Sequence, residues 1–433
     1  MEAAGMLSPL LLALWAKICY DGVYLLMEDD KMSKRVVIIG GGAAGMVCAI
    51  EAARRGARVT VLERMDRVGK KLLATGNGRC NLMNTGEPQY PRGEYFARKV
   101  LSKCGPEEQK HFWERLGLRL REESEGRVYP ACGQASSVLD TLRLAMHVEG
   151  VEVRCGLHAR KIEGTKGNFT VHAGEDIFHA DEVVVAGGGQ AQPKLGSDGS
   201  AVKLLEALGH RVFPAQPVLT QVMCDTRPLQ GLSGIRVKAE ITVRRKDKVF
   251  YKENGEVLFA DYGLSGVCMM NAAGFLQPGV TLTLNLLPGM GLASVQEAEE
   301  ELLRRRDAWP FAAMESLLCG LCVPRLASAL CKEAGISFKG NTVGRLTERE
   351  ATRMAALMAD FRVEVTGVKG FDQAQVTRGG AHVKEFDPET MESRLVPGLY
   401  AAGEALDVDG LCGGYNLMFA FGSGIIAGRS VEV

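Results

Sequence analysis

A glycine-rich turn between a strand and a helix is the clearest chemical signal in this sequence. Residues 36–45 read VVIIGGGAAG, so four apolar residues lead directly into Gly40-x-Gly42-x-x-Gly45. In such a turn the first glycine allows a tight bend. The second glycine lets a pyrophosphate approach the backbone, and the third lets the helix pack against the strand. The N–H groups and dipole of the helix stabilise phosphate charge. The pattern predicts a dinucleotide site.

A second strand that ends in an acid completes this unit. Residues 58–63 read RVTVLE, and Glu63 follows Gly42 by about 20 residues. A carboxylate at this place can accept hydrogen bonds from both ribose hydroxyls, which favours FAD or NAD over NADP with its 2′-phosphate. A lone glycine motif is weak evidence, but strand, glycines, helix, strand and acid in register are strong evidence.

The segment after Glu63 favours FAD over NAD. Residues 64–84 read RMDRVGKKLLATGNGRCNLMN, which is basic and glycine-rich and does not continue an alternating strand and helix pattern. Such a segment can wrap a second phosphate and a ribityl chain. Phosphate charge could be offset by Arg64, Lys70, Lys71 and Arg79, and the backbone could approach a flat ring at Gly76 and Gly78. The alternative interpretation is a solvated basic loop.

The C-terminal part carries a second set of turn residues. Residues 398–404 read GLYAAGE, a short apolar strand that ends in a turn and an acid, Glu404, suited to ribityl hydroxyls. Gly413-Gly414-Tyr415-Asn416 then precedes an apolar run that predicts a helix. Its N-terminus would stabilise the electron-rich edge of a reduced flavin ring. Gly422-x-Gly424-x-x-Ala427 has no framing strand or acid, so we interpret it as small residues for close helix packing.

Two alternative metal or redox sites have less support. Three acids, Glu404, Asp407 and Asp409, could bind a hard cation, but no matching oxygen cluster is nearby, so we expect no metal. Cys319 and Cys322 form a CxxC pair without a second pair or paired histidines. We therefore expect a reduced structural pair in a helical region. The 12 cysteines are scattered along the chain, which suits a reducing cytoplasm.

The composition is that of a folded protein with several domains. At about 150 residues per domain, 433 residues predict two to three domains. Hydrophobic residues make up 46% and charged residues 24%, which excludes a disordered chain. The 52 basic residues equal the 52 acidic ones without a block of like charge, which argues against a nucleic-acid partner and a membrane anchor. With 52 glycines and only 15 prolines, many tight, ligand-approaching turns are expected.

Periodicity divides the chain into several stretches. The apolar run at 7–15 is too short to cross a bilayer and has no basic residue before it, so we treat 1–31 as an extension outside the fold. For residues 1–31, a signal peptide and a docking segment are the alternatives.

Alternating segments between 218 and 287 predict antiparallel strands. Residues 294–360 are helical, with a capping box at Ser294 and Glu297. Solvated ion pairs are expected for Glu300–Arg304 and Glu301–Arg305, and strand-rich character returns at 363–433.

Six stretches together resemble one known family. They are GGGAAG with GKKLLATGNGRCNLMN, DEVVVAGGG (181–189) with Pro193 and Gly196-Ser-Asp-Gly199, GEVLFADYGLSG (255–266), VTRGG (376–380) and TMESRLVPGLYAAGEALDVDGLCGGYN (390–416). The sequence is similar over residues 32–433 to the BaiN/YhiN-type FAD-binding flavoproteins, also described as aminoacetone-oxidase-like NAD(P)/FAD-dependent oxidoreductases.

The resemblance implies an α/β fold with an interrupted cofactor domain. A two-dinucleotide-binding-type FAD (Rossmann-like) domain would comprise residues 32–205 and 363–433. It would be interrupted by a β-rich domain at 206–290 and a helical domain at 291–362.

The resemblance also implies the FAD-binding residues. They are Gly40, Gly42, Ala43, Ala44, Gly45, Glu63, Arg64, Gly69, Lys70, Lys71, Thr75, Gly76, Asn77, Gly78, Arg79, Cys80, Asn81, Ala159, Ala186, Gly187, Gly188, Gly403, Glu404, Asp407, Gly413, Gly414, Tyr415 and Asn416. The sequence departs from the family at four places. It has Gly187 where the family usually has threonine, and Ala191-Gln192 where the family often has a serine-tyrosine pair. Histidine is common near Asp261 and threonine is common at Met83, and these two departures concern the substrate side.

The implied activity is that of an FAD-dependent oxidoreductase. The family suggests reduction of a C=C bond conjugated to a ketone in a small steroid or bile-acid-like molecule, with NAD(P)H as a transient electron donor. The alternatives are oxidation of a small amine and a non-catalytic role as a flavin sensor or scaffold. Tyr262 and Cys412 are weak candidates for proton transfer, since either could be a packing residue. The substrate and the oligomeric state stay open.

Overall fold

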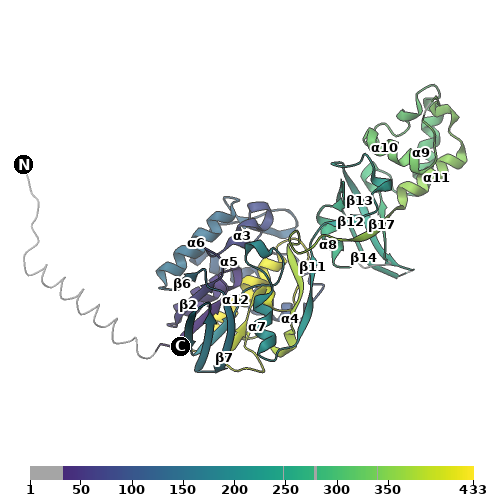
Figure 1. Cartoon of the computed structure of the whole chain (residues 1–433). Coiled ribbons are helices and arrows are strands. Elements are labelled where there is room, and N and C mark those ends of the chain that lie inside the picture. The colour runs from purple at the N-terminus through teal and green to yellow at the C-terminus, as the bar shows by residue number, and fades with distance from the viewer. Residues whose placement is uncertain (1–32, 247, 277–279, 339) are drawn as a thin grey trace, which may run out of the picture.

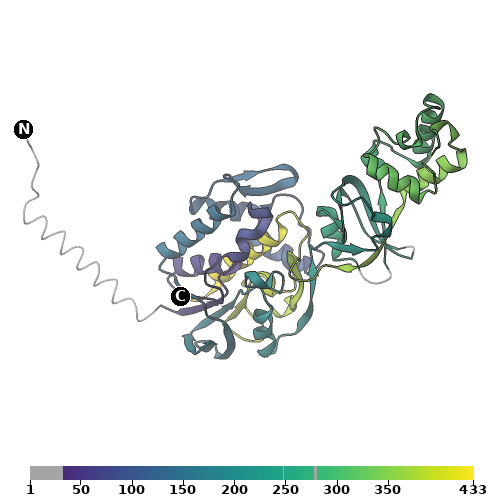
Figure 2. The same ribbon diagram turned by 45° about the horizontal axis from the view of Figure 1, so that its top comes forward.

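The computed structural model describes residues 33–246, 248–276, 280–338 and 340–433. Its parts follow one another in a row (Figures 1 and 2): an α/β part holds the C-terminus, a β-barrel adjoins it, and a helical cluster forms the far end. The expected extension at 1–31 lies outside the described residues.

A parallel five-stranded sheet is the centre of the α/β part. The strand order is β19-β10-β1-β2-β6, with β1 at Arg35–Ile39, β2 at Arg58–Glu63, β6 at Glu152–Cys155, β10 at Glu182–Val185 and β19 at Leu399–Ala401. Valine and isoleucine fill β1 and β10 because side chains on both faces of a parallel sheet are buried. The sheet confirms the predicted strand–turn–helix–strand unit.

Helices and two small sheets surround this sheet. The helices are α2 (Ala43–Arg54), α3 (Lys70–Ala74), α4 (Glu94–Lys103), α5 (Pro106–Arg115), α6 (Ala135–Val148), α7 (Ser200–Ala207) and α12 (Tyr415–Ser430). One small sheet contains β3 (Met83–Asn84), β4 (Leu120–Glu122) and β5 (Arg127–Pro130), and the other contains β7 (Ala159–Thr165), β8 (Asn168–Ala173) and β9 (Asp176–Ala180).

Helices α2 and α12 approach each other closely because of glycine. A Cβ added at Gly424 would lie 2.3 Å from the Ala44 carbonyl oxygen, and one added at Gly428 would lie 2.4 Å from that of Cys48. No side chain fits at these distances. The prediction that the glycines near Gly422 serve helix packing is confirmed.

A two-stranded ribbon joins the α/β part to the barrel. Strand β11 (Val212–Val218) pairs antiparallel with β18 (Val376–Ala381). The barrel order is β12-β15-β14-β13-β16-β17, formed by Val222–Cys224, Gly263–Ser265, Lys248–Ala260, Arg236–Arg245, Thr281–Asn285 and Phe361–Val368. Because β17 closes the barrel, this part extends to Val368, past the expected boundary at 363. The short helix α8 (Val267–Ala273) follows β15.

The helical cluster contains α9 (Val295–Ala308), α10 (Pro324–Glu333) and α11 (Glu348–Ala359). Its buried side chains, such as Leu302, belong to the same hydrophobic core as Leu284 of the barrel. Cys319 and Cys322 lie in turns between α9 and α10, within the helical region where the sequence places them. Both are free thiols.

The charges of α9 differ from the expected pattern. The Ser294 Oγ accepts from the Glu297 N–H, as expected, but the Glu297 carboxylate accepts from Ala293 N–H and not from Ser294. Glu301 pairs with both Arg304 and Arg305, so the predicted Glu300–Arg304 pair is wrong.

The prediction that the charged residues of α9 are solvated is wrong for Arg305, which is buried. Its guanidinium donates to the carbonyls of Leu317 and Cys319. A buried guanidinium that binds loop carbonyls holds this turn, and sequence spacing cannot reveal that.

Starting the chain at Met32 should leave the fold and the bound cofactor intact. The sheet begins at Arg35, whose backbone N–H and guanidinium bind Asp181, so the first strand is anchored without any earlier residue. Absorbance of the purified shortened protein and its unfolding midpoint would check this. Insoluble protein would mean that the 7–15 run packs against the fold.

Candidate active site

A cavity of about 670 Å³ lies at the carboxyl ends of the parallel strands. Its walls come from the turns after β1, β2 and β10, from the 69–81 segment, from the start of α12 and from α8 of the barrel. In open α/β sheets, ligands bind at this edge. The cavity is where the sequence predicts a dinucleotide.

The start of α2 faces the cavity without a side chain or acid in the way. Gly42 caps the helix, a Cβ added there would meet open space, and the first turn has no acidic residue. A Cβ at Gly45 would lie 1.9 Å from the Gly40 carbonyl oxygen, so Gly45 serves packing and does not line the cavity. The free N–H groups and dipole of this end suit a phosphate.

The carboxylate of Glu63 is held at the end of β2 by backbone groups. Its Oε2 accepts from Gly41 N–H at 2.9 Å and its Oε1 from Met65 N–H at 2.8 Å. The side chain is only 7% exposed but lines the cavity. Each carboxylate oxygen has a further lone pair, so the geometry leaves acceptors for two ribose hydroxyls.

Glu404 connects three cavity segments. Its Oε2 lies 2.7 Å from Lys71 Nζ and its Oε1 accepts from Thr377 N–H at 2.6 Å. The Thr377 hydroxyl in turn accepts from the N–H groups of Gln190 and Ala191. The C-terminal acid therefore fixes the turn after β10 and the 69–81 segment to one another.

The start of α12 forms the opposite end of the cavity. Gly414 caps this helix, whose first turn has no acid, and the Asn416 amide exchanges two 2.8 Å hydrogen bonds with Gly410. Nearby, Asn81 Oδ1 is buried and has no hydrogen-bond partner among the described residues. A buried acceptor of this kind usually has a partner. A donor on a ligand in the cavity would satisfy it.

Most of the predicted cofactor residues meet at this cavity. It is lined by Gly40, Gly42, Ala43, Ala44, Glu63, Arg64, Gly69, Lys70, Lys71, Thr75, Gly76, Asn77, Arg79, Asn81, Ala159, Ala186, Gly187, Gly188, Gly403, Glu404, Gly413, Gly414 and Asn416.

Five predicted residues lie outside the lining. Gly45 packs against the turn, Gly78 is in the left-handed region at φ 81°, and the Cys80 thiol is buried. Asp407 pairs with Arg92 at 2.7 Å, and the Tyr415 ring packs edge-on against Tyr90.

Some lining residues escape sequence reasoning. Tyr129 and Arg127 come from β5, and Val267 and Met270 come from α8 of the barrel. The Arg79 guanidinium lies 4.1 Å from the centre of the Tyr129 ring and fixes it. Strand β5 carries no motif, and the motif at 255–266 ends at Gly266, the residue that caps α8, so neither Tyr129 nor Met270 could be placed from the sequence.

The two proton-transfer candidates lie in different places. Cys412 lines the cavity, and its N–H donates to Asn271 Oδ1 at 2.8 Å. Tyr262 does not line the cavity: its ring lies under Lys369 Nζ and its carbonyl accepts from Cys224 N–H. These contacts favour the interpretation of Tyr262 as a packing residue over that of a proton donor.

Burial raises the pKa of the Cys412 thiol, so it should resist alkylation. The exposed Cys132 is the matched control, because a hydrogen bond with Ser137 lowers its pKa. With limiting iodoacetamide at about pH 8, Cys132 should be modified well before Cys412, which peptide mass spectrometry would show. Faster modification of Cys412 would contradict the raised pKa of its half-buried thiol.

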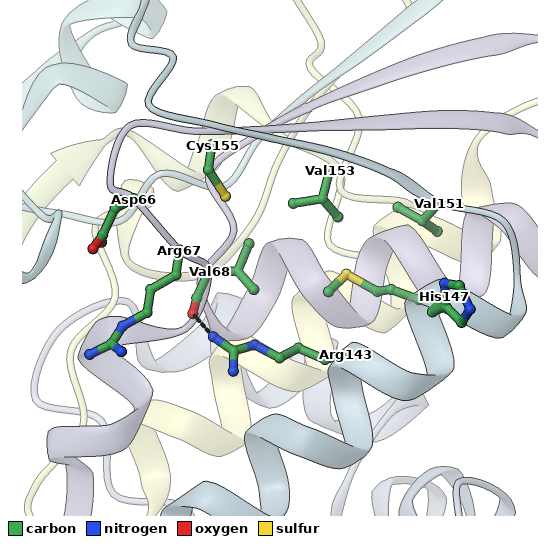
Figure 3. Close-up of a pocket in the computed structure, with 9 residues that line it drawn as sticks. Asp66, Arg67, Val68, Arg143, His147, Val151, Val153 and Cys155 are labelled. Carbon is green, nitrogen blue, oxygen red and sulfur yellow. Dashed lines mark hydrogen bonds between the residues drawn. The ribbon is translucent and has the colours of Figure 1, made fainter.

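A second hollow, of about 350 Å³, lies between α6 and β6. Figure 3 shows Arg143 reaching over to the Val68 carbonyl, at 3.3 Å, with His147 further along the same helix. Its floor is apolar, and none of the predicted site residues lines it. It borders the loop that leads to Gly69, so it lies next to the main cavity's wall.

Comparison with known proteins identifies the family. The family model described as the HI0933-like protein Rossmann domain matches residues 34–430. The chain belongs to this family. It is an FAD-dependent oxidoreductase with a Rossmann-type cofactor fold, as the sequence predicted.

Two curated relatives cover nearly the whole chain. A 3-dehydro-bile acid delta(4,6)-reductase of Clostridium scindens is 34% identical, over 92% of this chain and 98% of its own. A ribosomal RNA dihydrouridine synthase of Escherichia coli is 29% identical, over 89% of this chain and 95% of its own. A solved Rhodococcus jostii 3-ketosteroid-delta4-(5alpha)-dehydrogenase has a TM-score of 0.44 at 18% identity, covering 92% of this chain and 95% of its own.

The residues present fit FAD. The open space at Gly42, the carboxylate of Glu63 and the unpartnered Asn81 oxygen match a pyrophosphate, a ribose and a hydrogen-bond donor respectively. Within the described residues, no helix has the length and apolarity to cross a membrane.

Proposed function

We propose that this protein reduces a carbon–carbon double bond conjugated to a carbonyl group, on a small steroid-like or bile-acid-like enone. The observation that carries the proposal is the 34% identity to a bile acid delta(4,6)-reductase over nearly the full length of both chains. Amine oxidation and a non-catalytic role are not favoured, because neither curated relative described above has such a role.

The cofactor-binding roles are part of the proposal. Gly40, Gly42 and the start of α2 would hold the pyrophosphate, Glu63 the ribose, and Gly413 and Gly414 at the start of α12 the flavin ring. When bound, FAD accepts two electrons and passes them on as a hydride. The start of α12 would stabilise negative charge on the reduced ring by its dipole.

The barrel side of the cavity supplies the substrate wall. Val267 and Met270 of α8 are apolar and face the cavity together with Leu219 and Val376. An apolar wall opposite the cofactor segments suits a flat, largely apolar molecule. The shape of this wall would then decide which enones the cavity accepts.

Two groups on the cavity wall can supply the proton. Reduction of the double bond needs a hydride at the β-carbon and a proton at the α-carbon. Burial raises the pKa of both the Cys412 thiol and the Tyr129 hydroxyl, so each is protonated at neutral pH. The net reaction consumes one NAD(P)H and one proton for each double bond.

A second candidate substrate is the uracil ring. The Escherichia coli relative is a ribosomal RNA dihydrouridine synthase, and uridine becomes dihydrouridine when its C5=C6 bond, conjugated to the C4 carbonyl, is reduced. The two relatives therefore share one reaction type on different molecules. The chemistry proposed here holds for both.

Product analysis tests the reaction type. The holoprotein would be incubated anaerobically with NADH or NADPH and a 4-ene-3-one steroid, with boiled protein as the control. We expect the conjugated absorbance to disappear and the product to gain two hydrogens per double bond by mass spectrometry. A parallel aerobic incubation contains a small amine such as aminoacetone, and hydrogen peroxide formed there from the amine and oxygen, without enone reduction in the anaerobic one, would support the oxidase instead.

NAD(P)H should react in the same cavity as the substrate and leave before it enters. Only one parallel sheet with a framed glycine turn occurs in the described part of the chain, and the glycines at 422–424 lie inside α12. Steady-state kinetics should therefore give parallel double-reciprocal lines. Converging lines would show a ternary complex and a separate nicotinamide site.

We also propose that the protein works in the cytoplasm. Eleven cysteines of the described chain are free thiols, which suits a reducing cytoplasm.

A further inference from the structure

Strand β5 presents a cation and a phenol to the cavity from one face. Arg127 and Tyr129 are two residues apart on this strand, so their side chains point to the same side, about 7 Å apart at the backbone. Both line the cavity. Burial raises the pKa of the Tyr129 hydroxyl and of the Cys412 thiol, and the charge of Arg127 offsets part of this rise in each. The guanidinium therefore lies close to both cavity acids.

The Arg127 guanidinium is available to a ligand. Only its Nη2 has a hydrogen-bond partner among the described residues, the carboxylate of Glu125. The Glu125 side chain is 70% exposed, and an ion pair at the surface holds its members weakly. An arginine has five N–H donors in a planar fork, so several of them remain for an oxygen atom inside the cavity.

The turn before Arg127 fixes where this side chain lies. Glu125 has a φ of 61°, in the left-handed region that side chains rarely adopt, and Gly126 follows with a φ of 70°. The buried amide of Asn84 holds the turn, because it donates to the Glu125 carbonyl at 3.1 Å and to the Gly413 carbonyl at 2.8 Å. Strained backbone of this kind persists only where surrounding contacts impose it. Asn84 thus connects the turn to the segment where the proposed function places the flavin ring.

Cys412 lies between these polar groups and the apolar wall of the cavity. Its side chain packs against the apolar cluster that contains Leu219 and Val376, which suits a wall residue better than a proton donor. The Tyr129 ring, by contrast, is held by the Arg79 guanidinium, while its hydroxyl has no hydrogen-bond partner in the described part of the chain. A flat molecule on the apolar wall would have its polar end at the side chains of β5.

Enone reduction makes demands on two neighbouring atoms of the substrate. When a hydride reaches the β-carbon, negative charge moves to the carbonyl oxygen, and the α-carbon then takes a proton. The carbonyl oxygen and the α-carbon are bonded to the same carbon, so the group that stabilises the oxygen and the group that supplies the proton must be neighbours. A cation and an acid on one strand face meet this requirement, and donors aimed at developing charge contribute strongly to catalysis.

We propose that Arg127 binds the carbonyl oxygen of the substrate and that Tyr129 gives the proton to its α-carbon, an inference that rests on the enone reduction proposed above. The β-carbon receives the hydride, whose two electrons come from NAD(P)H, and the C=C bond becomes a single bond. The O–H bond of Tyr129 breaks as the α-carbon gains its hydrogen, and water then returns a proton to the phenolate. Arg127 stabilises the negative charge first on the substrate oxygen and then on the phenolate.

Carbon-13 NMR of a bound substrate tests the carbonyl contact without turnover. A 4-ene-3-one steroid labelled at its carbonyl carbon would be added to the oxidised holoprotein, which has no electrons to reduce it. A cation at the oxygen moves the carbonyl resonance downfield, so we expect it further downfield in wild type than in Arg127→Met, with Arg127→Lys between them. Equal resonance positions in wild type and Arg127→Met would overturn the proposal.

Arg119→Met is the matched control for Arg127→Met. Arg119 directly precedes β4 in the same small sheet, is exposed and does not line the cavity. This variant should give the wild-type carbonyl resonance and the wild-type rate of enone reduction. A change of the resonance as large as that in Arg127→Met would show a general effect of removing charge from this sheet and would overturn the proposal.

Re-oxidation of the reduced holoprotein by the enone measures the chemical contribution. Arg127→Met and Tyr129→Phe should each slow this step about 100-fold, as expected for the loss of a charge-stabilising donor or of a general acid. Re-oxidation by oxygen and FAD content should match wild type, because neither needs these groups. Equal slowing with oxygen and with the enone would overturn the catalytic roles. So would a larger slowing in Cys412→Ala than in Tyr129→Phe, which would assign the proton to the thiol.

The two measurements separate this inference from the proposed function. If the wild-type protein reduces no enone but the bound carbonyl resonance depends on Arg127, the carbonyl contact stands and the reductase function fails. If wild type, Arg127→Met and Tyr129→Phe reduce the enone equally fast, the reductase function stands and this inference fails.

Discussion

Replacing Gly424 with valine should lower the free energy of unfolding by about 3 kcal/mol and leave the protein largely without FAD. A Cβ at this position would lie 2.3 Å from the backbone oxygen of Ala44, which cannot move without shifting α2. Since α2 and α12 both begin at the cavity, separating them displaces both helix N-termini from the cofactor. Chemical denaturation and flavin absorbance per protein would measure the two effects.

The matched control for Gly424→Val is Gly370→Val. Gly370 is exposed, and an added Cβ would meet no atom within 4 Å. This variant should differ from wild type by less than about 0.5 kcal/mol and keep its FAD. Full flavin content in Gly424→Val would show that helix contact does not position the cofactor site.

Replacing Glu63 with alanine should weaken FAD binding about 10- to 150-fold. Hydrogen bonds to a charged group are worth about 1.5–3 kcal/mol, and the change also leaves the N–H groups of Gly41 and Met65 without their acceptor. Titration of the apoprotein with FAD, followed by flavin fluorescence, would measure the affinity.

Glu63→Gln is the control for that prediction. It keeps the shape and one acceptor oxygen but not the charge, so its affinity should lie between those of wild type and Glu63→Ala. Unchanged affinity in the alanine variant would place the ribose elsewhere.

The local parts of the fold could be predicted from the sequence. The β1–α2–β2 unit and the start of α12 depend on glycines and apolar runs that are contiguous, so spacing alone indicates their structure. The same holds for Glu63, because strand length fixes where it stands. Resemblance to a family supplied most of the remaining lining residues.

Long-range pairings could not be predicted in this way. Strand β17 joins the barrel although the helical cluster separates it from β16, and Arg305 is buried by loop carbonyls that follow it in the chain. Tyr129 and Met270 reach the cavity because of where β5 and α8 are placed in three dimensions. Periodicity does not encode such placements.

The most direct test of the central claim is re-oxidation of the reduced holoprotein. The flavin would be reduced anaerobically with one equivalent of NADH or NADPH and mixed in a stopped-flow instrument with an enone or with oxygenated buffer. The account predicts that the enone restores the oxidised flavin spectrum faster than oxygen does and yields the saturated ketone. The account would be contradicted if oxygen re-oxidised the flavin rapidly while neither an enone nor a uridine-containing RNA restored the oxidised flavin spectrum.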